Sequence, residues 1–385
     1  MRDVAAPLEA ALASRGLSVA DVAEHLVRHL EVDPSSTVFA YGSLVEGLGN
    51  ASSDLDLCIL TGGAETDITP SRNSAFEIAG LQCDLMPVSK RAFRRAIELL
   101  RELNREPVDV RRAALELDYP QRRMLHALLN GETLMGAEAQ SVLGTDLAPR
   151  ELIRNLLART RYWFGNLQAD LAGMRRAGDW TSMILPSQEA VLLGCDALLA
   201  ALGKTNPTPK WRVKQLETIA AAGTPLSGGG TASPAERLFD LLRVPATLGH
   251  ADILGFALRA VAFGRRSLLW AERALLGLGE TRDPGDGGAP GASVLDLDIG
   301  ILPDGERLRF VRPGDGAAVT APADLSRLIV GLDEGTVTTA LEAAAMRAGG
   351  TPLASEAALF LGECEQAGFL IARPDLEARL SALLG

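Results

Sequence analysis

Three aspartates in the first quarter of the chain have the residue type and spacing that metal-dependent phosphoryl transfer requires. Asp54 and Asp56 flank a leucine at the start of the apolar run 55–60. Strand alternation puts both carboxylates on one face. Two carboxylates at the start of a buried strand need a counter-charge, because desolvating an unpaired charge is costly. Mg²⁺ meets this need, since it prefers carboxylate oxygens and bridges them to substrate phosphates.

A third carboxylate follows on the next expected strands. Residues 76–88 predict a strand, a tight turn at Ala79-Gly80 and a return strand, with Asp84 among apolar neighbours. A strand pairing that brings Asp84 beside the first two aspartates completes a site for two metal ions. Such ions, about 4 Å apart, stabilise both the attacking and the leaving oxygen of a phosphoryl transfer. The competing interpretation is that each aspartate is an ordinary surface turn or cap residue.

A Gly-Ser pair lies between the first apolar strand, residues 38–41, and the aspartates. Gly42 allows the backbone to come close to a phosphate, because glycine has no Cβ. The Ser43 hydroxyl can donate a hydrogen bond to that phosphate. The pair therefore predicts a phosphate-binding turn next to the carboxylates.

At this point the chain resembles the nucleotidyltransferases of the DNA polymerase β superfamily. Gly42, Ser43, Asp54, Asp56 and Asp84 stand where that superfamily has its Gly-Ser pair and three carboxylates. The sequence of the motif is most similar to those of terminal uridylyltransferases and non-standard poly(A) polymerases. The resemblance covers less than a quarter of the chain. The resemblance implies that Asp54 and Asp56 bind two Mg²⁺ ions, and that the Gly-Ser pair holds a nucleoside triphosphate. It also implies that Asp84 holds the catalytic ion and helps to activate the attacking hydroxyl.

The chain departs from that pattern in two places. Small bacterial members often have an arginine at the position of Glu46, and a glutamate cannot neutralise a triphosphate. The central domain typical of the uridylyltransferases has no recognisable counterpart after residue 90. The motif therefore supports the reaction more strongly than it supports RNA as the substrate.

Lysine is rare in this chain, and three of its four lysines fall within eleven residues. Lys210 and Lys214 are four residues apart, so they would share one face of a helix that begins after Pro209. In a chain that otherwise uses arginine, a retained lysine indicates a position that needs a compact ammonium group. We expect these two lysines to supply the phosphate charge that Glu46 does not. A solvated basic helix start is the competing interpretation.

Composition limits the class of protein. The net charge of −11 argues against broad nonspecific nucleic-acid binding, which depends on neutralising phosphates. No apolar run approaches the roughly 20 residues that span a membrane, and no signal peptide is visible. Four cysteines are scattered without paired spacing, which favours core thiols over ligands. We expect a cytoplasmic protein without a membrane partner.

Hydrophobic periodicity and composition predict three domains of α+β class. Residues 1–90 form a small mixed-sheet nucleotidyltransferase core preceded by amphipathic helices. Residues 91–275 form an all-helical middle domain, and the Gly- and Pro-rich residues 276–293 form a linker. Residues 294–385 form a small winged-helix-like domain.

The C-terminal residues 294–385 predict two strands followed by helices. The strands are expected at 294–302 and 307–312, and the helices at 323–332, 336–347 and 355–367. With the motifs at 328–337 and 367–370, this segment resembles the PqqD-like domains that recruit precursor peptides to tailoring enzymes. It carries 14 Asp and Glu against 7 Arg and no Lys, which makes DNA an unlikely partner. Peptide capture by strand addition and a purely structural cap are the two interpretations.

The resulting hypothesis is an Mg²⁺-dependent nucleotidyltransferase. It would move a nucleoside monophosphate from a nucleoside triphosphate to a small-molecule or peptide acceptor, with release of pyrophosphate. The alternatives are an RNA 3′-terminal nucleotidyltransferase, a nucleotide second-messenger synthase, and a non-catalytic peptide-binding module with a degenerate core. Asp84 is the candidate general base, and Glu189 or Glu217 of the helical domain are the alternatives.

Overall fold

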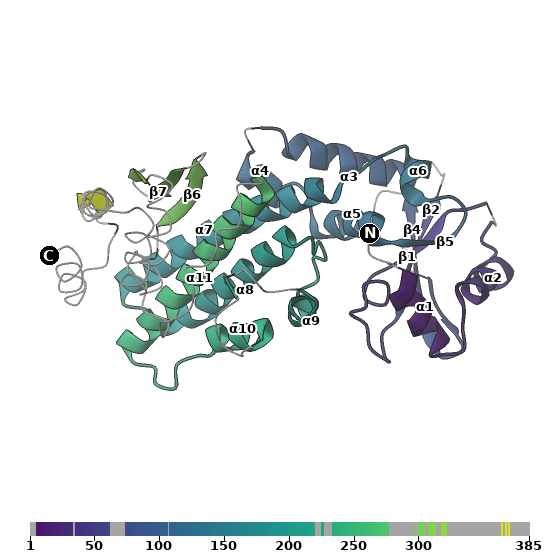
Figure 1. The fold of residues 1–385 in the computed structure, drawn as a ribbon, viewed down its shortest axis with the longest axis horizontal. Coiled ribbons are helices and arrows are strands. Elements are labelled where there is room, and N and C mark those ends of the chain that lie inside the picture. Colours follow the sequence, from purple (N-terminus) through teal and green to yellow (C-terminus); the bar gives the residue numbers. More distant parts are fainter. Residues whose placement is uncertain are drawn as a thin grey trace, which may run out of the picture. The chain divides into compact units, whose positions relative to one another are not determined.

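The structure of the chain is a computed structural model. It describes residues 5–33, 35–61, 74–106, 108–219, 225–226, 233–276, 297, 299–304, 307–312, 317–321, 363–364, 366–367 and 369. The chain divides into two compact units (Figure 1). The first unit comprises Met1–Leu156 with Gly203–Gln215, and the second comprises Leu157–Leu202 with Leu216–Gly385.

The first unit is built on a mixed sheet of five strands in the order β3-β4-β2-β1-β5. The strands are β1 (Val38–Tyr41), β2 (Leu55–Thr61), β3 (Ser74–Ile78), β4 (Leu81–Ser89) and β5 (Glu132–Met135). Strands β2 and β4 are parallel, and the other neighbouring pairs are antiparallel. The α+β class and the mixed sheet expected from the sequence are confirmed.

Helices cover both faces of this sheet. They are α1 (Ala5–Ala13), α2 (Val19–His29), α3 (Lys90–Leu103), α4 (Val110–Leu115), α5 (Tyr119–Asn130) and α6 (Ala139–Leu143). Leu55 and Leu57 of β2 enter a buried cluster with side chains of α1 and α2. Cys58 and Leu60 enter a second cluster with α3, α5 and α6. Because strand residues alternate between faces, Asp56 faces the side covered by α3 and α5.

Local signals in the sequence locate the ends of these elements. Ser18 caps α2, since its side chain accepts from the Asp21 N–H while the Asp21 carboxylate accepts from the Ser18 N–H. Strands β3 and β4 form the predicted hairpin. Its turn residues Ala79 and Gly80 have φ angles of 48° and 82°, the left-handed conformation that matches strand twist in two-residue hairpin turns.

The prediction that residues 91–275 are all helical is wrong at β5. This strand pairs with β1, with Ala40 opposite Glu132, and so belongs to the sheet. Helices α3 and α5 bury their apolar sides in the same core as β1 and β2. The boundary expected at residue 90 therefore does not coincide with the division into units. A four-residue strand is too short for alternation to separate it from a helix end.

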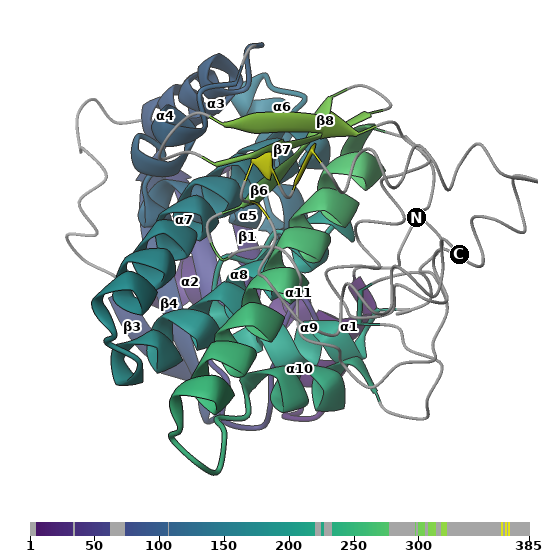
Figure 2. The ribbon, with the colours of Figure 1, turned by 90° about the vertical axis from the view of Figure 1, so that its left-hand side faces the viewer.

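The second unit is mainly helical, with one small sheet. Its elements are α7 (Pro149–Ala177), η1 (Thr181–Met183), α8 (Ile184–Ala201), α9 (Arg212–Glu217), α10 (Pro234–Leu242), α11 (His250–Leu276), β6 (Gly300–Asp304), β7 (Arg307–Val311) and β8 (Ala318–Ala321). Helices α7 and α9 contribute residues to both units. Helices α8 and α11 lie side by side, and β6, β7 and β8 form an antiparallel sheet (Figure 2). Gln168 of α7 donates to the carbonyls of Leu297 and Ile299, both at 2.9 Å.

The C-terminal expectations are met only in part. The strand predicted at 307–312 is confirmed as β7. Of the strand predicted at 294–302, residues 300–302 belong to β6, and residues 294–296 and 298 lie outside the described residues. Strand β8 was not predicted. The helices predicted at 323–332 and 336–347 lie outside the described residues, as do most of 355–367 and nearly all of the linker 276–293. The winged-helix assignment therefore stays a prediction.

One helical segment of the described chain is long and apolar enough to cross a membrane by length and composition, contrary to the sequence expectation. It spans Thr181–Ala201, and 61% of its apolar 18-residue window is buried inside the fold. It includes α8, which packs against α11. A buried core helix is apolar on all sides and therefore meets the same criterion.

Two glycines allow the close packing of α8 and α11. A Cβ on Gly194 would lie 3.0 Å from the Cα of Gly264. A Cβ on Gly264 would lie 2.7 Å from Cζ of Phe164 and 3.1 Å from the carbonyl oxygen of Ala190. Small residues at these two positions therefore set the distance between the helices.

Gly264→Ala is expected to lower the free energy of unfolding by about 1–3 kcal/mol, because the added methyl group overpacks this contact. The matched control is Gly165→Ala in α7, where a Cβ meets nothing within 4 Å. The control should raise the free energy of unfolding by about 0.5–1 kcal/mol, since alanine loses less backbone entropy than glycine in a helix. Urea titration measures both, and equal effects of the two substitutions would contradict the packing account.

Candidate functional site

The three predicted carboxylates lie near the start of the parallel strands β2 and β4 of the first unit. Asp56 of β2 lies opposite Asp84 of β4, and Leu55 lies opposite Cys83. Neighbouring strands are about 4.8 Å apart, so the two aspartates are direct neighbours. Asp54 comes one residue before β2 and is exposed. The strand pairing that the sequence analysis required is confirmed.

Burial and like charges make Asp56 unusual. Its side chain is only 19% exposed. Burial is the main reason that the pKa of Asp56 is raised to about 6, and the negative charges of Asp54 and Asp84 raise it further. The positive charges of Arg123 and Lys210 lower it in part. A cluster of carboxylates that is only partly neutralised is relieved by a bound cation. Three carboxylates are hard oxygen donors, so the donor set fits Mg²⁺.

The three carboxylates do not surround a common metal position in this structure. Within the described ranges, no group of three or more His, Cys, Asp or Glu side chains is arranged to hold a metal ion. The neighbouring thiols of Cys58 and Cys83 are buried and free. Burial raises the pKa of Cys83 to about 12, so this thiol stays neutral near pH 7 and is a core residue, as expected. The aspartates alone therefore provide the charged ligands.

The Gly42-Ser43 turn packs directly against Asp56. Gly42 has a φ of 82°, and a Cβ built on it would overlap Oδ2 of Asp56 and lie 3.2 Å from Cγ. Ser43 is buried, and its carbonyl accepts from the N–H groups of Leu48 and Gly49, both at 2.8 Å. Glycine at position 42 therefore gives the Asp56 carboxylate its space, in addition to the predicted approach to phosphate.

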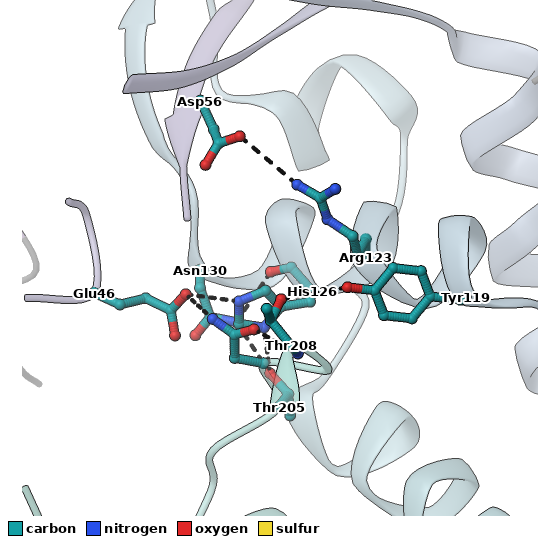
Figure 3. A network of polar contacts seen from close by, with 9 residues as sticks. Glu46, Asp56, Tyr119, Arg123, His126, Asn130, Thr205 and Thr208 are labelled. Carbon is teal, nitrogen blue, oxygen red and sulfur yellow. Dashed lines mark hydrogen bonds and ion pairs between the residues drawn. The ribbon is translucent and has the colours of Figure 1, made fainter. Parts of the chain in front are cut away.

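Glu46 belongs to a partly buried polar network (Figure 3). Its carboxylate accepts from Nε2 of His126 at 2.9 Å and from Nδ2 of Asn206 at 2.7 Å. The other ring nitrogen of His126 lies 2.9 Å from Oγ1 of Thr205 and 3.0 Å from Nδ2 of Asn130. The network therefore ties the loop after Ser43 to α5 and to the segment that begins at Gly203.

The two predicted phosphate lysines have different surroundings. Nζ of Lys214 donates to the carbonyls of Leu48 and Gly49, at 2.9 and 3.4 Å. Nζ of Lys210 lies 4.8 Å from the centre of the Trp211 ring. The charge of Lys210 lowers the pKa of Asp56. Lys214 thus anchors the loop after the Gly-Ser turn, and Lys210 acts electrostatically on the carboxylates. The helix expected after Pro209 is observed as η2 (Pro209–Trp211) followed by α9.

Sequence reasoning missed the polar side of α5. Tyr119, Arg123, His126 and Asn130 recur at helical spacing on this helix, and Met124, Leu125 and Leu128 form its buried side. Nη2 of Arg123 lies 3.6 Å from Oδ1 of Asp56. The hydroxyl of Tyr119 lies 3.5 Å from Oγ1 of Thr208. The periodicity of these polar residues was the available signal that one side of α5 faces other polar groups.

Glu46→Ala is expected to lower the free energy of unfolding by about 1–3 kcal/mol, because His126 and Asn206 lose their shared acceptor. Glu46→Arg introduces the residue that small bacterial nucleotidyltransferases often have at the corresponding position of the motif, yet it should destabilise at least as much, since a guanidinium accepts no hydrogen bond. Glu98→Ala on the exposed side of α3 is the control and should change stability by less than about 0.5 kcal/mol. Urea titration decides, and a Glu46→Arg variant more stable than wild type would contradict the structural role of Glu46.

Comparison of the chain with models of protein families and with curated proteins finds no match. A functional conclusion therefore rests on the carboxylate cluster, the Gly-Ser turn and the polar side of α5.

Proposed function

We propose that the first unit is the catalytic unit of an Mg²⁺-dependent nucleotidyltransferase. It moves a nucleoside monophosphate from a nucleoside triphosphate to a hydroxyl or similar group of a small molecule or peptide, and releases pyrophosphate. The observation that carries the proposal is the register of the parallel strands, in which Asp56 is the direct neighbour of Asp84 and follows Asp54 by two residues. Clustered carboxylates beside a Gly-Ser turn suit metal-assisted transfer of a phosphoryl group.

Asp54, Asp56 and Asp84 would hold two Mg²⁺ ions, which when bound neutralise the triphosphate and the departing pyrophosphate. The donor set supports this assignment. So does the raised pKa of Asp56, since burial first and the charges of Asp54 and Asp84 second disfavour its ionised form, and a bound cation would stabilise that form. The Gly42 turn allows the triphosphate to approach the backbone. Lys210 adds positive charge on the same side, because it acts electrostatically on Asp56.

The transfer step needs an in-line displacement and one proton acceptor. The acceptor oxygen forms a bond to the α-phosphorus while the bond from that phosphorus to the bridging oxygen of the β-phosphate breaks. The proton of the acceptor hydroxyl passes to a carboxylate. Asp84 is the candidate base within this unit, and the alternatives Glu189 and Glu217 belong to the second unit. Positioning and charge neutralisation supply most of the rate enhancement.

The acidity of the chain supports a small acceptor over a long nucleic acid. The net charge is −11, and nonspecific nucleic-acid binding depends on basic residues that neutralise phosphates. A precursor peptide bound by residues 294–385 is the peptide version of the proposal.

Pyrophosphate release by the full-length protein tests the proposed reaction. Each of the four nucleoside triphosphates is supplied with Mg²⁺ and with one of three additions: no acceptor, an oligoribonucleotide, or a mixture of small metabolites and peptides. We expect release with the third addition only, and none from Asp54→Ala/Asp56→Ala. Extension of the oligoribonucleotide would replace the proposal by RNA tailing, and a nucleotide-only product would replace it by second-messenger synthesis. No release under any condition would contradict the proposal.

A further inference from the structure

The proposed triphosphate site needs a cation that can reach both the carboxylates and the phosphates. Glu46, in the loop after the Gly-Ser turn, cannot supply it, because a carboxylate carries negative charge; it accepts from His126 and Asn206. Lys214 donates to the carbonyls of Leu48 and Gly49, so two of its three N–H groups are already used.

Arg123 is placed to supply that cation. Its side chain is 45% exposed, and Nη2 lies 3.6 Å from Oδ1 of Asp56, which is itself mostly buried (Figure 3). Asp56 is the ion-pair partner that the described part of the structure shows for Arg123. The contact is longer than a hydrogen bond between charged groups, about 2.7–2.9 Å, and it involves one nitrogen of a guanidinium with five donors.

The backbone that carries Arg123 is held firmly while its side chain is not. His126 and Asn130, one and two turns further along α5, are fixed by hydrogen bonds to Glu46 and Thr205. The partly exposed side chain of Arg123 can therefore change partner without movement of the helix. A guanidinium can bind phosphate through two parallel hydrogen bonds. The single long contact between Arg123 and Asp56 leaves this capacity unused.

We propose that Arg123 is an exchangeable counter-ion: it faces Asp56 before metal binds and turns to the β- or γ-phosphate of the nucleoside triphosphate once Mg²⁺ occupies the carboxylates. The inference rests on the proposed function and adds a phosphate-binding residue to it. Arg123 thus has two opposite effects. It competes with the metal ion for Asp56, and it attracts the nucleotide.

Two binding measurements on the full-length protein test these opposite effects. Mn²⁺ binding without nucleotide is followed by electron paramagnetic resonance, and binding of each nucleoside triphosphate with Mg²⁺ by equilibrium dialysis, both at pH 8 so that protons do not compete for the carboxylates. In Arg123→Gln we expect tighter Mn²⁺ binding, by about threefold or more, because a neighbouring positive charge is removed. We expect nucleotide binding to weaken by about tenfold, because a charged hydrogen-bonding partner is lost.

Two further variants complete the design. Arg123→Lys should bind Mn²⁺ like wild type, because the charge is kept, and bind nucleotide only partly as well, because the fork is lost. Arg28→Gln in α2 breaks the exposed ion pair with Glu24 and should change neither affinity.

The outcomes separate the inference from the function on which it rests. Tighter Mn²⁺ binding with unchanged or tighter nucleotide binding in Arg123→Gln would overturn the exchange, since Arg123 would then be a counter-ion only. Weaker binding of both ligands would also overturn it, because the side chain would then support the site's structure. Failure of the wild-type protein to bind any nucleotide would overturn the proposed function itself, and the inference with it.

Discussion

Asp56→Asn is expected to abolish nucleotidyl transfer and, in the same protein, to raise its stability in the absence of metal. Removing one charged ligand from a metal-assisted phosphoryl transfer should lower turnover by at least about 10³-fold. The stability gain follows from the raised pKa of Asp56, from 3.8 to about 6. At about 1.36 kcal/mol per pKa unit, ionised Asp56 costs up to about 3 kcal/mol above pH 6. Asparagine removes that cost, which already includes the opposing charge of Arg123.

The gain in the free energy of unfolding from Asp56→Asn depends on pH. Between pH 4 and 6, Asp56 is largely protonated in the folded protein and largely ionised in the unfolded chain, because its folded pKa is the higher of the two. The contribution of Asp56 to wild-type stability therefore falls as pH rises from about 4 to about 6, and stays constant above. Urea titrations of the metal-free protein at pH 4.5 and 7.5 should show a gain from Asp56→Asn that is larger at pH 7.5.

Asp146→Asn is the matched control for this experiment. Its side chain is 96% exposed and pairs with Arg101 at the surface, so the change should alter stability by less than about 1 kcal/mol and leave turnover intact. A destabilised Asp56→Asn at pH 7.5 would contradict the account, since the carboxylate would then contribute more to the fold than its burial and its neighbours' charges cost.

Gly42→Ala is expected to remove activity through the position of one carboxylate. The added Cβ would overlap Oδ2 of Asp56 and lie 3.2 Å from its Cγ, at a backbone φ of 82°. The left-handed conformation alone costs a residue with a Cβ about 1–2 kcal/mol. The overlap must in addition push the carboxylate aside or distort the turn. Because a displacement of about 1 Å at a catalytic group can cost about 10²-fold in rate, we expect a loss of that size or more in kcat/KM.

Gly80→Ala separates the two effects. Gly80 has the same φ of 82°, and a Cβ built on it meets nothing within 4 Å. The control should therefore show the stability loss of about 1–2 kcal/mol that the left-handed backbone imposes, with unchanged turnover. Thermal melts and kcat/KM of both variants provide the comparison. Similar activity losses in the two variants would show that backbone strain, and not the space around Asp56, is responsible.

Local sequence signals correctly predicted the strands that carry Asp56 and Asp84. The strand of Asp56 and the hairpin that carries Asp84 depend on residues near one another in the chain, and alternation and turn chemistry report such relations. The parallel pairing of β2 with β4 is not local. The sequence analysis gave a pairing that brings Asp84 beside Asp56 as the condition for a three-carboxylate site, and it did not predict that the two strands are parallel.

The rest of the site depends on contacts between distant segments. Nothing in the local sequence joins Glu46 to His126, or Arg123 to Asp56, because each pair is separated by more than 60 residues and has no common motif. Strand β5 escaped prediction because a four-residue strand gains its stability from pairing with β1. Lys214 was expected to meet phosphate, but backbone carbonyls of the loop after Ser43 accept its ammonium. Charge and spacing singled out Lys214, but they did not predict that the carbonyls of Leu48 and Gly49 are its partners.

Thermal unfolding with nucleoside triphosphates tests the central claim most directly, because binding needs no acceptor. The full-length wild type and Asp54→Ala/Asp56→Ala are melted with each of the four triphosphates, with and without Mg²⁺. A ligand at about 100 times its dissociation constant stabilises the folded state by about 2.7 kcal/mol. The account predicts a stabilisation of wild type by one or more triphosphates that requires Mg²⁺ and is absent from the double variant. No stabilisation of wild type by any triphosphate, or an equal stabilisation of the variant, would contradict the assignment of these carboxylates to a nucleotide site.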